Sequence, residues 1–459
     1  MGAISIRNTV LLGLLSLYIV FNYGFMQVRI PPSVGSGIPI GELVLILSLL
    51  TINYLKLFPK LARTVCLWPF IIWWVFGIGT AFAGVPDYGM WALRDATHVI
   101  ESLFLIVGFV FAAQPNAIGK FFRWLGMLSV FICIYALGYP FSDTLWRYSP
   151  VVIAGAGNQV PIFFTYTGTS AMVLFAISYF MLFSNYRGFQ SNVLWVFITF
   201  MMGFTIFLFQ ARTVYLQVIA LLLLFALFKR RVFKSGILIL FVLAVFLITV
   251  PFLDLQITGR LGQDVSMDFI ISHFMAIGGI ESEGVEGAAS GVGQRLTWWA
   301  NIFDKLLYSV KTAIIGLGFG EPLTDFLVTG GVPVREPHNS YISIIGRLGL
   351  IGFISFVWMH YLLIKVWRSA HKMCIKINWQ EGANRLLVLL IFFVLIWVNA
   401  IGEDAFEKPF FALPYYFFWG VVLRFYSHLK NGIIGPNENL QTTSSPLAGG
   451  NTIENPISS

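Results

Sequence analysis

Residues 386–402 have the sequence LLVLLIFFVLIWVNAIG, which contains no charged side chain. A helix needs roughly 18–20 apolar residues to cross the hydrocarbon core of a bilayer. Comparable runs recur along the whole chain, near residues 9–26, 36–57, 64–84, 96–113, 117–139, 159–184, 191–209, 212–228, 233–253, 340–366, 384–402 and 408–427. The pattern predicts an all-α polytopic membrane protein with about twelve transmembrane helices.

The composition of the chain points the same way. Of its 459 residues, 58% are hydrophobic and 11% are charged, and the mean hydropathy is +0.81. Soluble domains have about 25% charged residues. The apolar runs are continuous, whereas the strands of a membrane barrel alternate between apolar and polar residues. The composition therefore favours a helical membrane protein.

The net charge of +8 is spread over short loops between the apolar runs, so it indicates topology and not a surface for nucleic acid. Lys229, Arg230 and Arg231 form the clearest basic cluster. Because basic loops are retained on the cytoplasmic side, we expect both termini to be cytoplasmic. The long loop between spans nine and ten is then extracytoplasmic, and the natural surroundings of the chain are membrane lipids.

These assignments divide the chain into four parts. Residues 1–253 carry spans one to nine, residues 254–338 form the extracytoplasmic loop, residues 339–430 carry spans ten to twelve, and residues 431–459 form a cytoplasmic tail. The middle of the loop, residues 277–293, is rich in Gly and Glu and is expected to be mobile. The tail is rich in Asn, Ser, Thr, Pro and Gly, and is expected to be disordered.

The segment 294–307, QRLTWWANIFDKLL, has the periodicity of an amphipathic helix. Its apolar face includes Trp298 and Trp299, so we expect this helix to lie in the lipid interface. Arg295 falls in the middle of that face. A guanidinium in this position favours an anionic partner such as a phosphate. The alternative is an arginine that extends to the headgroups without a catalytic role.

Pro337 and His338 precede span ten, and Asn339 or Ser340 is suited to cap the helix that follows. The positive end of that helix dipole disfavours an imidazolium, so we expect His338 to stay neutral and able to accept a proton. Such a ring could act as a general base on a sugar hydroxyl. The alternative is an ordinary histidine at the membrane surface.

Further polar residues mark the predicted outer ends of spans. Arg212 lies in a tight hairpin between spans seven and eight. It could bind an anion, or it could act only as a topological anchor. Arg94, His98 and Glu101 are spaced to share one face of span four, where they could bind a sugar, assist catalysis or form an internal ion pair. Glu403 and Asp404, between the last two spans, could belong to an acceptor site. The sequence shows no His/Cys cluster with metal spacing, so neither a metal nor another cofactor is expected.

Together these segments resemble the O-antigen ligase and polymerase superfamily, whose members ligate or polymerise polyprenyl-diphosphate-linked polysaccharide. The resemblance covers roughly residues 203–354. It is carried by the Arg212 hairpin, Arg295-x-x-Trp298, Gly316-Leu317-Gly318-Phe319-Gly320, and Pro337-His338-Asn339-Ser340-Tyr341 leading into Gly346-Arg347-Leu348-Gly349-Leu350-Ile351-Gly352.

The resemblance implies a GT-C-like, inverting, metal-independent glycosyltransferase of the bacterial inner membrane. The donor would be an undecaprenyl-diphosphate-linked glycan, and the acceptor a glycan or a lipid core. Arg212 and Arg295 would hold the diphosphate, and His338 would activate the acceptor hydroxyl.

Two questions stay open at this level. A transporter or flippase of lipid-linked sugars also has many spans, but it is expected to show paired halves, and no internal repeat is visible. Ligase and polymerase share one donor site and differ in the acceptor. Residues 277–293 contain three glutamates and no Lys or Arg. This acidic loop suits a phosphorylated lipid core poorly and favours a polymerase.

Overall fold

The computed structural model describes residues 3–30, 38–154, 159–183, 189–249, 271, 275, 288–328 and 332–436. Most of these residues are helical. The helices of the first half are α1 (Ala3–Met26), α2 (Ile40–Leu50), α3 (Tyr54–Ala62), α4 (Trp68–Tyr88), α5 (Met90–Asp95), α6 (Thr97–Ile100), η1 (Glu101–Leu103), α7 (Phe104–Phe111), α8 (Pro115–Ala136), η2 (Tyr139–Phe141), α9 (Ser142–Leu145), η3 (Trp146–Tyr148), α10 (Thr169–Phe183) and α11 (Phe189–Phe209).

The second half continues with α12 (Arg212–Phe228), α13 (Arg230–Thr249), α15 (Ala288–Leu307), α16 (Val310–Ile315), α17 (Ser340–Lys376), α18 (Gln380–Gly402) and α19 (Pro409–Lys430). In the described part of the chain, three short antiparallel hairpins join helices: β1 (Arg29–Ile30) with β2 (Ile38–Pro39), β3 (Val151–Ile153) with β4 (Gln159–Pro161), and β5 (Leu327–Val328) with β6 (Val332–Pro333).

The predicted all-α membrane class is confirmed, whereas the predicted number of twelve spans is not. Each of the twelve predicted regions contains helix. Among the described residues, however, seven helices are long and apolar enough to cross a membrane, or eight if the pair α2 and α3, bent by 97°, is one span. The helices over Thr97–Phe111, Thr169–Phe183 and Arg212–Phe228 are apolar but shorter.

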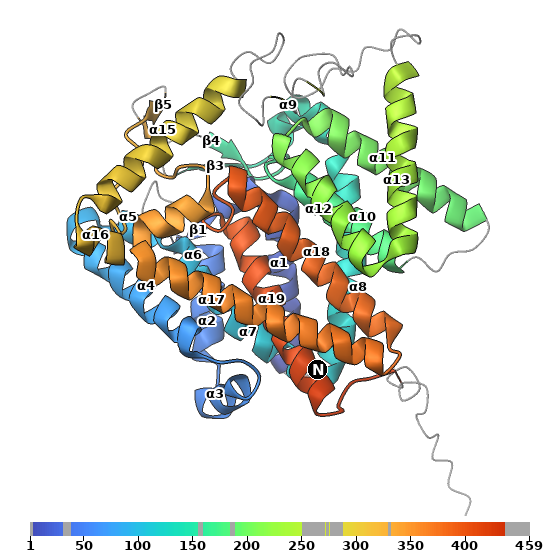
Figure 1. The fold of residues 1–459 in the computed structure, drawn as a ribbon, viewed down its shortest axis with the longest axis horizontal. Coiled ribbons are helices and arrows are strands. Elements are labelled where there is room, and N and C mark those ends of the chain that lie inside the picture. Colours follow the sequence, from blue (N-terminus) through green and yellow to red (C-terminus); the bar gives the residue numbers. More distant parts are fainter. Residues whose placement is uncertain are drawn as a thin grey trace, which may run out of the picture.

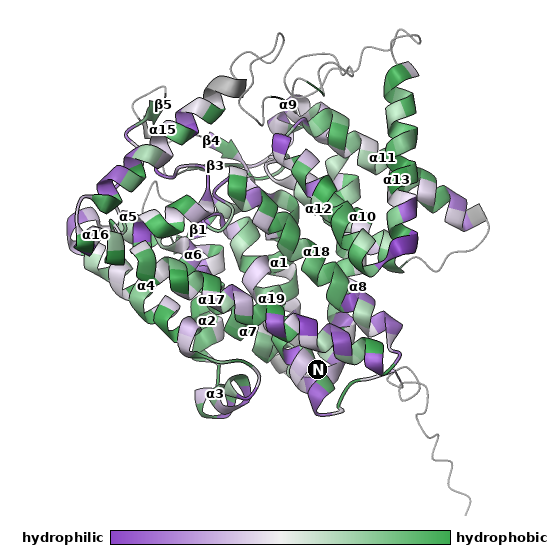
Figure 2. Cartoon of the chain, in the orientation of Figure 1, coloured by the Kyte–Doolittle hydropathy of each residue, from purple (hydrophilic) through white to green (hydrophobic). Residues whose placement is uncertain are grey.

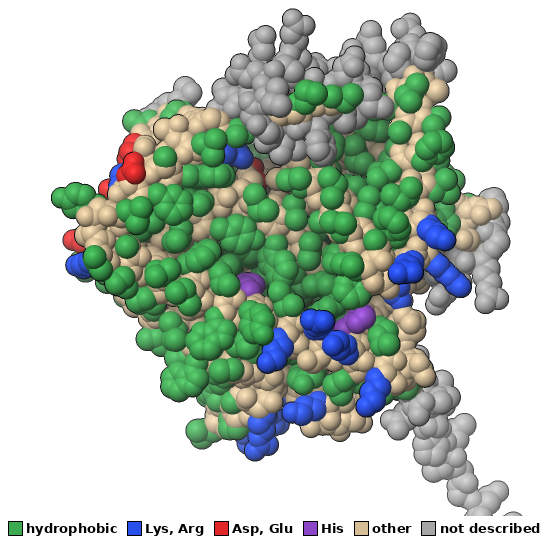
Figure 3. Space-filling view, in the orientation of Figure 1, with side chains coloured by type: hydrophobic (Ala, Val, Ile, Leu, Met, Phe, Trp, Pro, Cys, Tyr) green, Lys and Arg blue, Asp and Glu red, His purple; other side chains and the backbone are tan. Residues whose placement is uncertain are grey.

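The molecule has two polar edges separated by an apolar belt. The beginning of α1 and the end of α19 lie at the same edge, and α15 lies at the opposite one (Figure 1). The helices between the edges are mainly hydrophobic (Figure 2). On the face shown, most Lys and Arg side chains gather below the belt, at the edge that carries the two helix ends (Figure 3). This is the charge asymmetry expected of a membrane protein with basic cytoplasmic loops.

Helices α17, α18 and α19 cross the centre of the bundle and position the polar residues described below. Helix α19 packs tightly against α7. A side chain at Gly108 of α7 or Gly420 of α19 would collide with the backbone of the other helix. Helix pairs in membranes use small residues in this way, because packing between backbones replaces the hydrophobic effect.

Helix α17 is broken at Gly349, where φ is 58° and ψ is −158°. The break leaves backbone carbonyls without helical partners. The Gly316–Gly320 turn occupies this position: the N–H of Leu317 donates to the carbonyl of Gly346 at 2.8 Å, and the N–H of Gly318 donates to that of Arg347 at 3.0 Å. The glycine-rich turn therefore supplies the hydrogen-bond donors for the α17 carbonyls that the break leaves without helical partners.

Gly316 and Gly318 offer a matched test of this packing. Both have a left-handed backbone, with φ of 83° and 84°. A Cβ at Gly316 would collide with the backbone of Arg347 and Gly349, whereas one at Gly318 would meet open space. We expect Gly316→Ala to lower the melting temperature in detergent much more than Gly318→Ala, which adds only the strain of about 1 kcal/mol. Equal effects would show that the turn does not support the break.

Candidate functional site

The Arg212 hairpin is as tight as the sequence predicts. Helix α11 ends at Phe209 and α12 begins at Arg212, with Gln210 in a left-handed conformation (φ 46°). Gly402, at the end of α18, lies against this hairpin. A Cβ at Gly402 would lie 2.9 Å from Cγ2 of Thr213 and 4.0 Å from Nη1 of Arg295. The hairpin, the end of α18 and Arg295 therefore meet at one place.

Arg295 lies in α15 and donates from Nη1 to the carbonyl of Gly402 at 3.0 Å. Its positive charge acts on Arg212, so the two guanidinium groups lie within electrostatic range of each other. Two cations that act on each other in this way favour an anion between or beside them. The predicted helix around Arg295 is confirmed.

Part of the apolar face of α15 packs on protein, and the position of this helix in the lipid interface remains a prediction. Ile302 and Leu306 are buried in a small core with Leu323, packed against the first turns of α17. Nε1 of Trp299 donates to the carbonyl of Pro337 at 3.0 Å. The ring of Trp298 lies 6.0 Å from that of His338. The tryptophan pair thus supports the segment that carries His338.

His338 has an unusual backbone conformation, with φ of 51°. A residue other than glycine adopts this left-handed region at a cost of order 1 kcal/mol, and such strain is concentrated at functional sites. The conformation is fixed on both sides. Trp299 holds the preceding carbonyl, and Asn339 caps α17 by accepting from the N–H groups of Tyr341 and Ile342 at 3.0 and 3.1 Å. The predicted N-cap is confirmed.

The imidazole of His338 faces the segment between α18 and α19. Its Nδ1 atom lies 3.1 Å from Oδ2 of Asp404 and 3.9 Å from Oε2 of Glu403. Glu403 is engaged by Lys408, whose Nζ lies 2.9 Å from the same oxygen. Burial opposes ionisation of Glu403, but Lys408, His338 and Arg295 outweigh it and lower the pKa of this carboxyl.

Two further carboxyls, those of Glu407 and Glu336, interact electrostatically with Asp404, and the pKa of each is raised. Burial raises the pKa of Glu407 to about 8, with a further contribution from the negative charge of Asp404, although Ser340 donates a 2.5 Å hydrogen bond to Glu407. Burial likewise raises the pKa of Glu336 to about 7, against the opposing effect of Arg347. The acids around His338 therefore do not all carry a charge at neutral pH.

A buried ionic network anchors this part of the chain. Arg347 is 1% exposed, and its Nη2 atom lies 2.8 Å from Oε1 of Glu336 and 3.1 Å from Oδ2 of Asp95. Arg335 binds both oxygens of Asp95, at 3.0 and 2.6 Å. The N–H of Gly320 donates to the same carboxylate at 3.1 Å. The network ties α5, the glycine-rich turn and the start of α17 together.

Five of the predicted site residues are thus brought together: Arg212, Arg295, His338, Glu403 and Asp404. Their roles remain predictions. Arg94, His98 and Glu101 are placed differently. In the described part of the chain, no hydrogen bond or ion pair joins any of these three side chains to His338.

The predicted single helix face of Arg94, His98 and Glu101 is wrong, because the helix is interrupted after Asp95 and again at η1. Arg94 is exposed and lies over the ring of Trp91, at 4.6 Å from its centre. His98 and Glu101 are fully buried in the bundle. The exposed Arg94 and the buried His98 and Glu101 therefore do not form the single polar face that their helical spacing predicts.

Sequence analysis missed the network of Asp95, Arg335, Glu336 and Arg347. One signal was available: Arg347 interrupts an apolar run, and a charge inside a membrane span normally has a buried partner. The identity of that partner was not visible, because Asp95 lies more than 200 positions away in the chain. The Gly/Glu-rich part of the long loop up to residue 287 and the tail beyond residue 436 lie outside the described residues.

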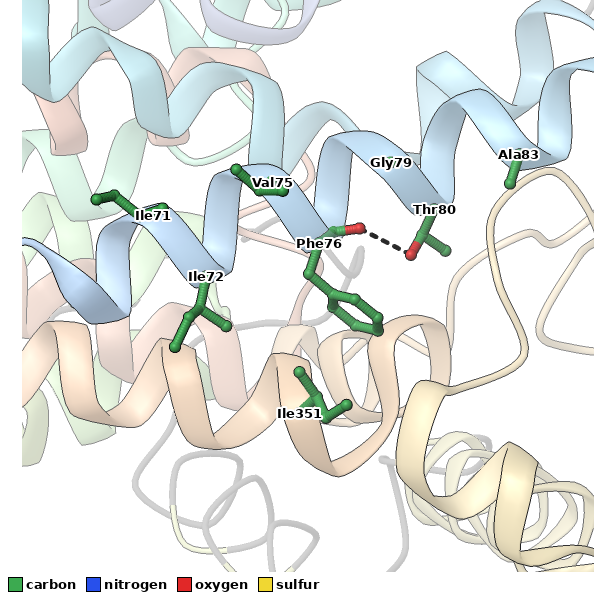
Figure 4. A pocket seen from close by; sticks show the side chains of 8 residues that line it. All are labelled: Ile71, Ile72, Val75, Phe76, Gly79, Thr80, Ala83 and Ile351. Atoms are coloured by element: carbon green, nitrogen blue, oxygen red, sulfur yellow. Dashed lines mark hydrogen bonds between the residues drawn. The ribbon is translucent and has the colours of Figure 1, made fainter.

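A shallow pocket elsewhere on the surface has no such chemistry (Figure 4). It is lined by Ile71, Ile72, Val75, Phe76, Gly79, Thr80, Ala83 and Ile351. Its one hydroxyl, on Thr80, donates to the carbonyl of Phe76. Within the described ranges, no three His, Cys, Asp or Glu side chains are grouped as a metal would require. The metal independence implied by the resemblance remains a prediction.

Comparison with known families agrees with the sequence resemblance. Residues 197–357 match the family model of the O-antigen ligase. No curated protein matches the chain. The matched segment includes Arg212, Arg295 and His338, whereas Asp95, Glu403 and Asp404 lie outside it. The predicted resemblance to the O-antigen ligase and polymerase superfamily is confirmed over this segment.

The buried carboxyls should make stability depend on pH. A carboxyl whose pKa rises on folding binds its proton more tightly in the folded protein, so the free energy of unfolding falls as pH rises from 4.5 towards 8. We expect the melting temperature in detergent to fall by a few degrees between pH 5.5 and 8.5. Glu407→Gln, which cannot ionise, should reduce this fall.

The matched control is Asp325→Asn, which removes a carboxylate that is 68% exposed and pairs with Lys305. It should leave the pH dependence unchanged. A wild-type melting temperature that is constant or rises over this interval would contradict the raised pKa values of Glu407 and Glu336.

Proposed function

We propose that this protein is a membrane glycosyltransferase of the O-antigen ligase or polymerase type, which moves glycan from a polyprenyl diphosphate to a hydroxyl acceptor. The main support is one arrangement: Arg295 lies beside the Arg212 hairpin, while His338 is held in a strained conformation against acidic residues. The match of residues 197–357 to the O-antigen ligase family supports the same reaction.

In the proposed reaction, the acceptor hydroxyl attacks the anomeric carbon of the donor sugar. Its proton passes to Nε2 of His338, and the new glycosidic bond forms as the bond from the anomeric carbon to the diphosphate breaks. The diphosphate leaves with that electron pair. Attack opposite to the leaving group inverts the anomeric centre. General base catalysis of this kind contributes about 10²- to 10⁴-fold.

Arg212 and Arg295 would bind the departing diphosphate. Guanidinium groups present fixed donors that match phosphate oxygens, and a positioned cation stabilises the charge that develops on a leaving group. The hydrogen bond from Arg295 to the carbonyl of Gly402 fixes one of the two groups. Their mutual repulsion would be relieved when the anion binds.

We further propose an undecaprenyl-diphosphate-linked glycan as donor and a bacterial inner-membrane location, with both termini cytoplasmic and the site extracytoplasmic. The product would be surface polysaccharide, formed by a polymerase or a ligase, and we favour the polymerase. Glu403 remains a candidate for contacting the acceptor. Arg94, on the exposed face of Trp91, is a candidate for contacting a more distant part of a substrate. His98 and Glu101, both fully buried, fit a role inside the bundle better than substrate contact.

The proposed base can be tested with purified protein in detergent, lipid-linked glycan donor and glycan acceptor, by following diphosphate release and glycosidic product. We expect His338→Ala to lower turnover by about 100-fold or more. Arg295→Ala should weaken turnover as well, because the leaving group loses a cation.

The matched control is His371→Ala, at a histidine of α17 that stacks on Trp367 and is not part of the site. It should retain full activity. A fully active His338→Ala protein would remove the proposed base. If vesicles instead show movement of the lipid-linked glycan across the bilayer with no glycosidic product, the protein is a transporter.

The proposed orientation has its own test, which uses a native cysteine. Cys66 is exposed, whereas Cys133 and Cys374 are buried. In intact spheroplasts, a membrane-impermeant maleimide should not label Cys66 until the membrane is permeabilised. In a Cys66→Ser background, Tyr308→Cys, at a position 90% exposed beside α15, should be labelled at once. The reverse pattern would invert the assigned topology.

A further inference from the structure

Asp404 was expected only as a possible substrate contact, yet its surroundings give it another role. It is 7% exposed, so little of it is available to a substrate. In the part of the chain that the structure describes, its carboxylate makes no hydrogen bond to the backbone. Its one ionic contact among the described residues is Nδ1 of His338, 3.1 Å from Oδ2. His338 therefore accounts for the position of this carboxylate.

The two nitrogens of the His338 ring have different surroundings. Nδ1 is fully enclosed and makes no hydrogen bond of good geometry, although Oδ2 of Asp404 lies within bonding distance. Contacts of this kind often tighten when substrate binds. A carboxylate next to Nδ1 selects the tautomer with the proton on Nδ1, which leaves the lone pair on Nε2 for the acceptor.

Glu403 is not an equivalent partner. Its Oε2 atom is 3.9 Å from Nδ1, beyond hydrogen-bonding distance, and only 2.9 Å from Nζ of Lys408. Lys408 thus neutralises Glu403 and leaves Asp404 to face the imidazole. Asp404 also lies beyond the end of the segment that matches the O-antigen ligase family, at residue 357.

From this geometry we propose that Asp404 is a positioning residue, which orients the His338 ring through Nδ1 and stabilises the imidazolium that forms when Nε2 takes the acceptor proton. The proposal rests on the proposed function and adds a second group to the catalytic apparatus. No group other than the acceptor hydroxyl gives up a proton in the step, and Asp404 neither gains nor loses one.

The remaining charged groups around His338 are compatible with this role. Arg295 approaches from α15, Glu403 and Lys408 from the α18–α19 segment, and Glu407 and Glu336 interact electrostatically with Asp404. Glu407, whose pKa burial raises to about 8, retains its proton at neutral pH, and the charge of Glu336 is paired with Arg347 at 2.8 Å, so neither adds much repulsion to the Asp404 carboxylate. Asp404 is thereby the negative charge nearest to Nδ1 of the ring, and the charge of Lys408 also acts on it.

The test is Asp404→Asn, which keeps the shape and removes the charge. We expect turnover to fall about 10- to 100-fold while the KM for donor changes by less than about twofold, because the donor site is intact. The acid limb of the pH–rate profile should move to lower pH by about one unit, since the imidazolium loses its anionic neighbour. Asp404→Glu should recover part of the turnover and the acid limb.

A structural role would give a different result. Oδ1 of Asp404 is a buried oxygen without a hydrogen bond, so removing the charge should leave the melting temperature unchanged or raise it. Lower turnover in a destabilised Asp404→Asn protein, with the pH profile unmoved, would overturn the proposal. Full activity with an unmoved profile would overturn it as well. Asp325→Asn, at an exposed carboxylate, controls for a general charge effect and should not alter the profile.

One readout does not depend on catalysis. In protein labelled with ¹³C-histidine, the His338 signal is identified by its loss in His338→Ala, and its titration is followed by NMR. Its midpoint should move to lower pH in Asp404→Asn. If the wild type forms no glycosidic product but this shift occurs, the proposed function fails while the His338–Asp404 pairing stands. If the wild type is active and the midpoint does not move, the pairing alone fails.

Discussion

The structure depends on one buried guanidinium. Arg347 lies in the apolar first half of α17 and is 1% exposed, so its charge must be compensated within the protein. Glu336 and Asp95 supply that compensation, and Arg335 balances the second charge on Asp95. Removing one member of such a group leaves a charge buried and unpaired, at a cost of about 3–5 kcal/mol. The partners must therefore stay together, and this fixes where the chain enters α17.

The same constraint explains the glycine-rich turn and the strained histidine. Arg347 is two residues before the break at Gly349, and its own carbonyl is taken by the N–H of Gly318. Irregular backbone within a membrane bundle is tolerated where protein satisfies its polar groups. Glu336, the partner of Arg347, is two residues before His338. The ionic network and the Trp299 bond to Pro337 thus hold the segment on both sides, and His338 is kept in its left-handed conformation between them.

Residue patterns predicted well what is local, and poorly what is long-range. Apolar runs located the helices, and the polar trio before span ten placed the N-cap at Asn339 or Ser340, of which the structure shows Asn339. Hydrophobicity does not distinguish a face that meets lipid from one that meets protein, and Ile302 and Leu306 of the apolar face of α15 pack on the start of α17. Helical spacing placed Arg94 and His98 on one helix face, because no helix-breaking residue in the sequence predicts the interruption after Asp95. The pairings of Asp95 with Arg347 and of Asp404 with His338 arise from tertiary packing. Residue spacing in a single sequence does not predict such contacts.

The distribution of charge within the site bears on what can enter it. Cations lie on the side of the Arg212 hairpin and α15, and acids lie on the side of the α18–α19 segment, with His338 at the boundary. A diphosphate is attracted to the first side and repelled by the second, so the donor is expected to bind in one orientation. The group that approaches His338 meets Glu403 and Asp404 instead. A neutral sugar hydroxyl can approach there without electrostatic cost, whereas a phosphorylated acceptor end would meet the negative charge of Asp404, since Lys408 compensates that of Glu403. This distribution of charge is compatible with the uncharged glycan acceptor of the polymerase that we propose.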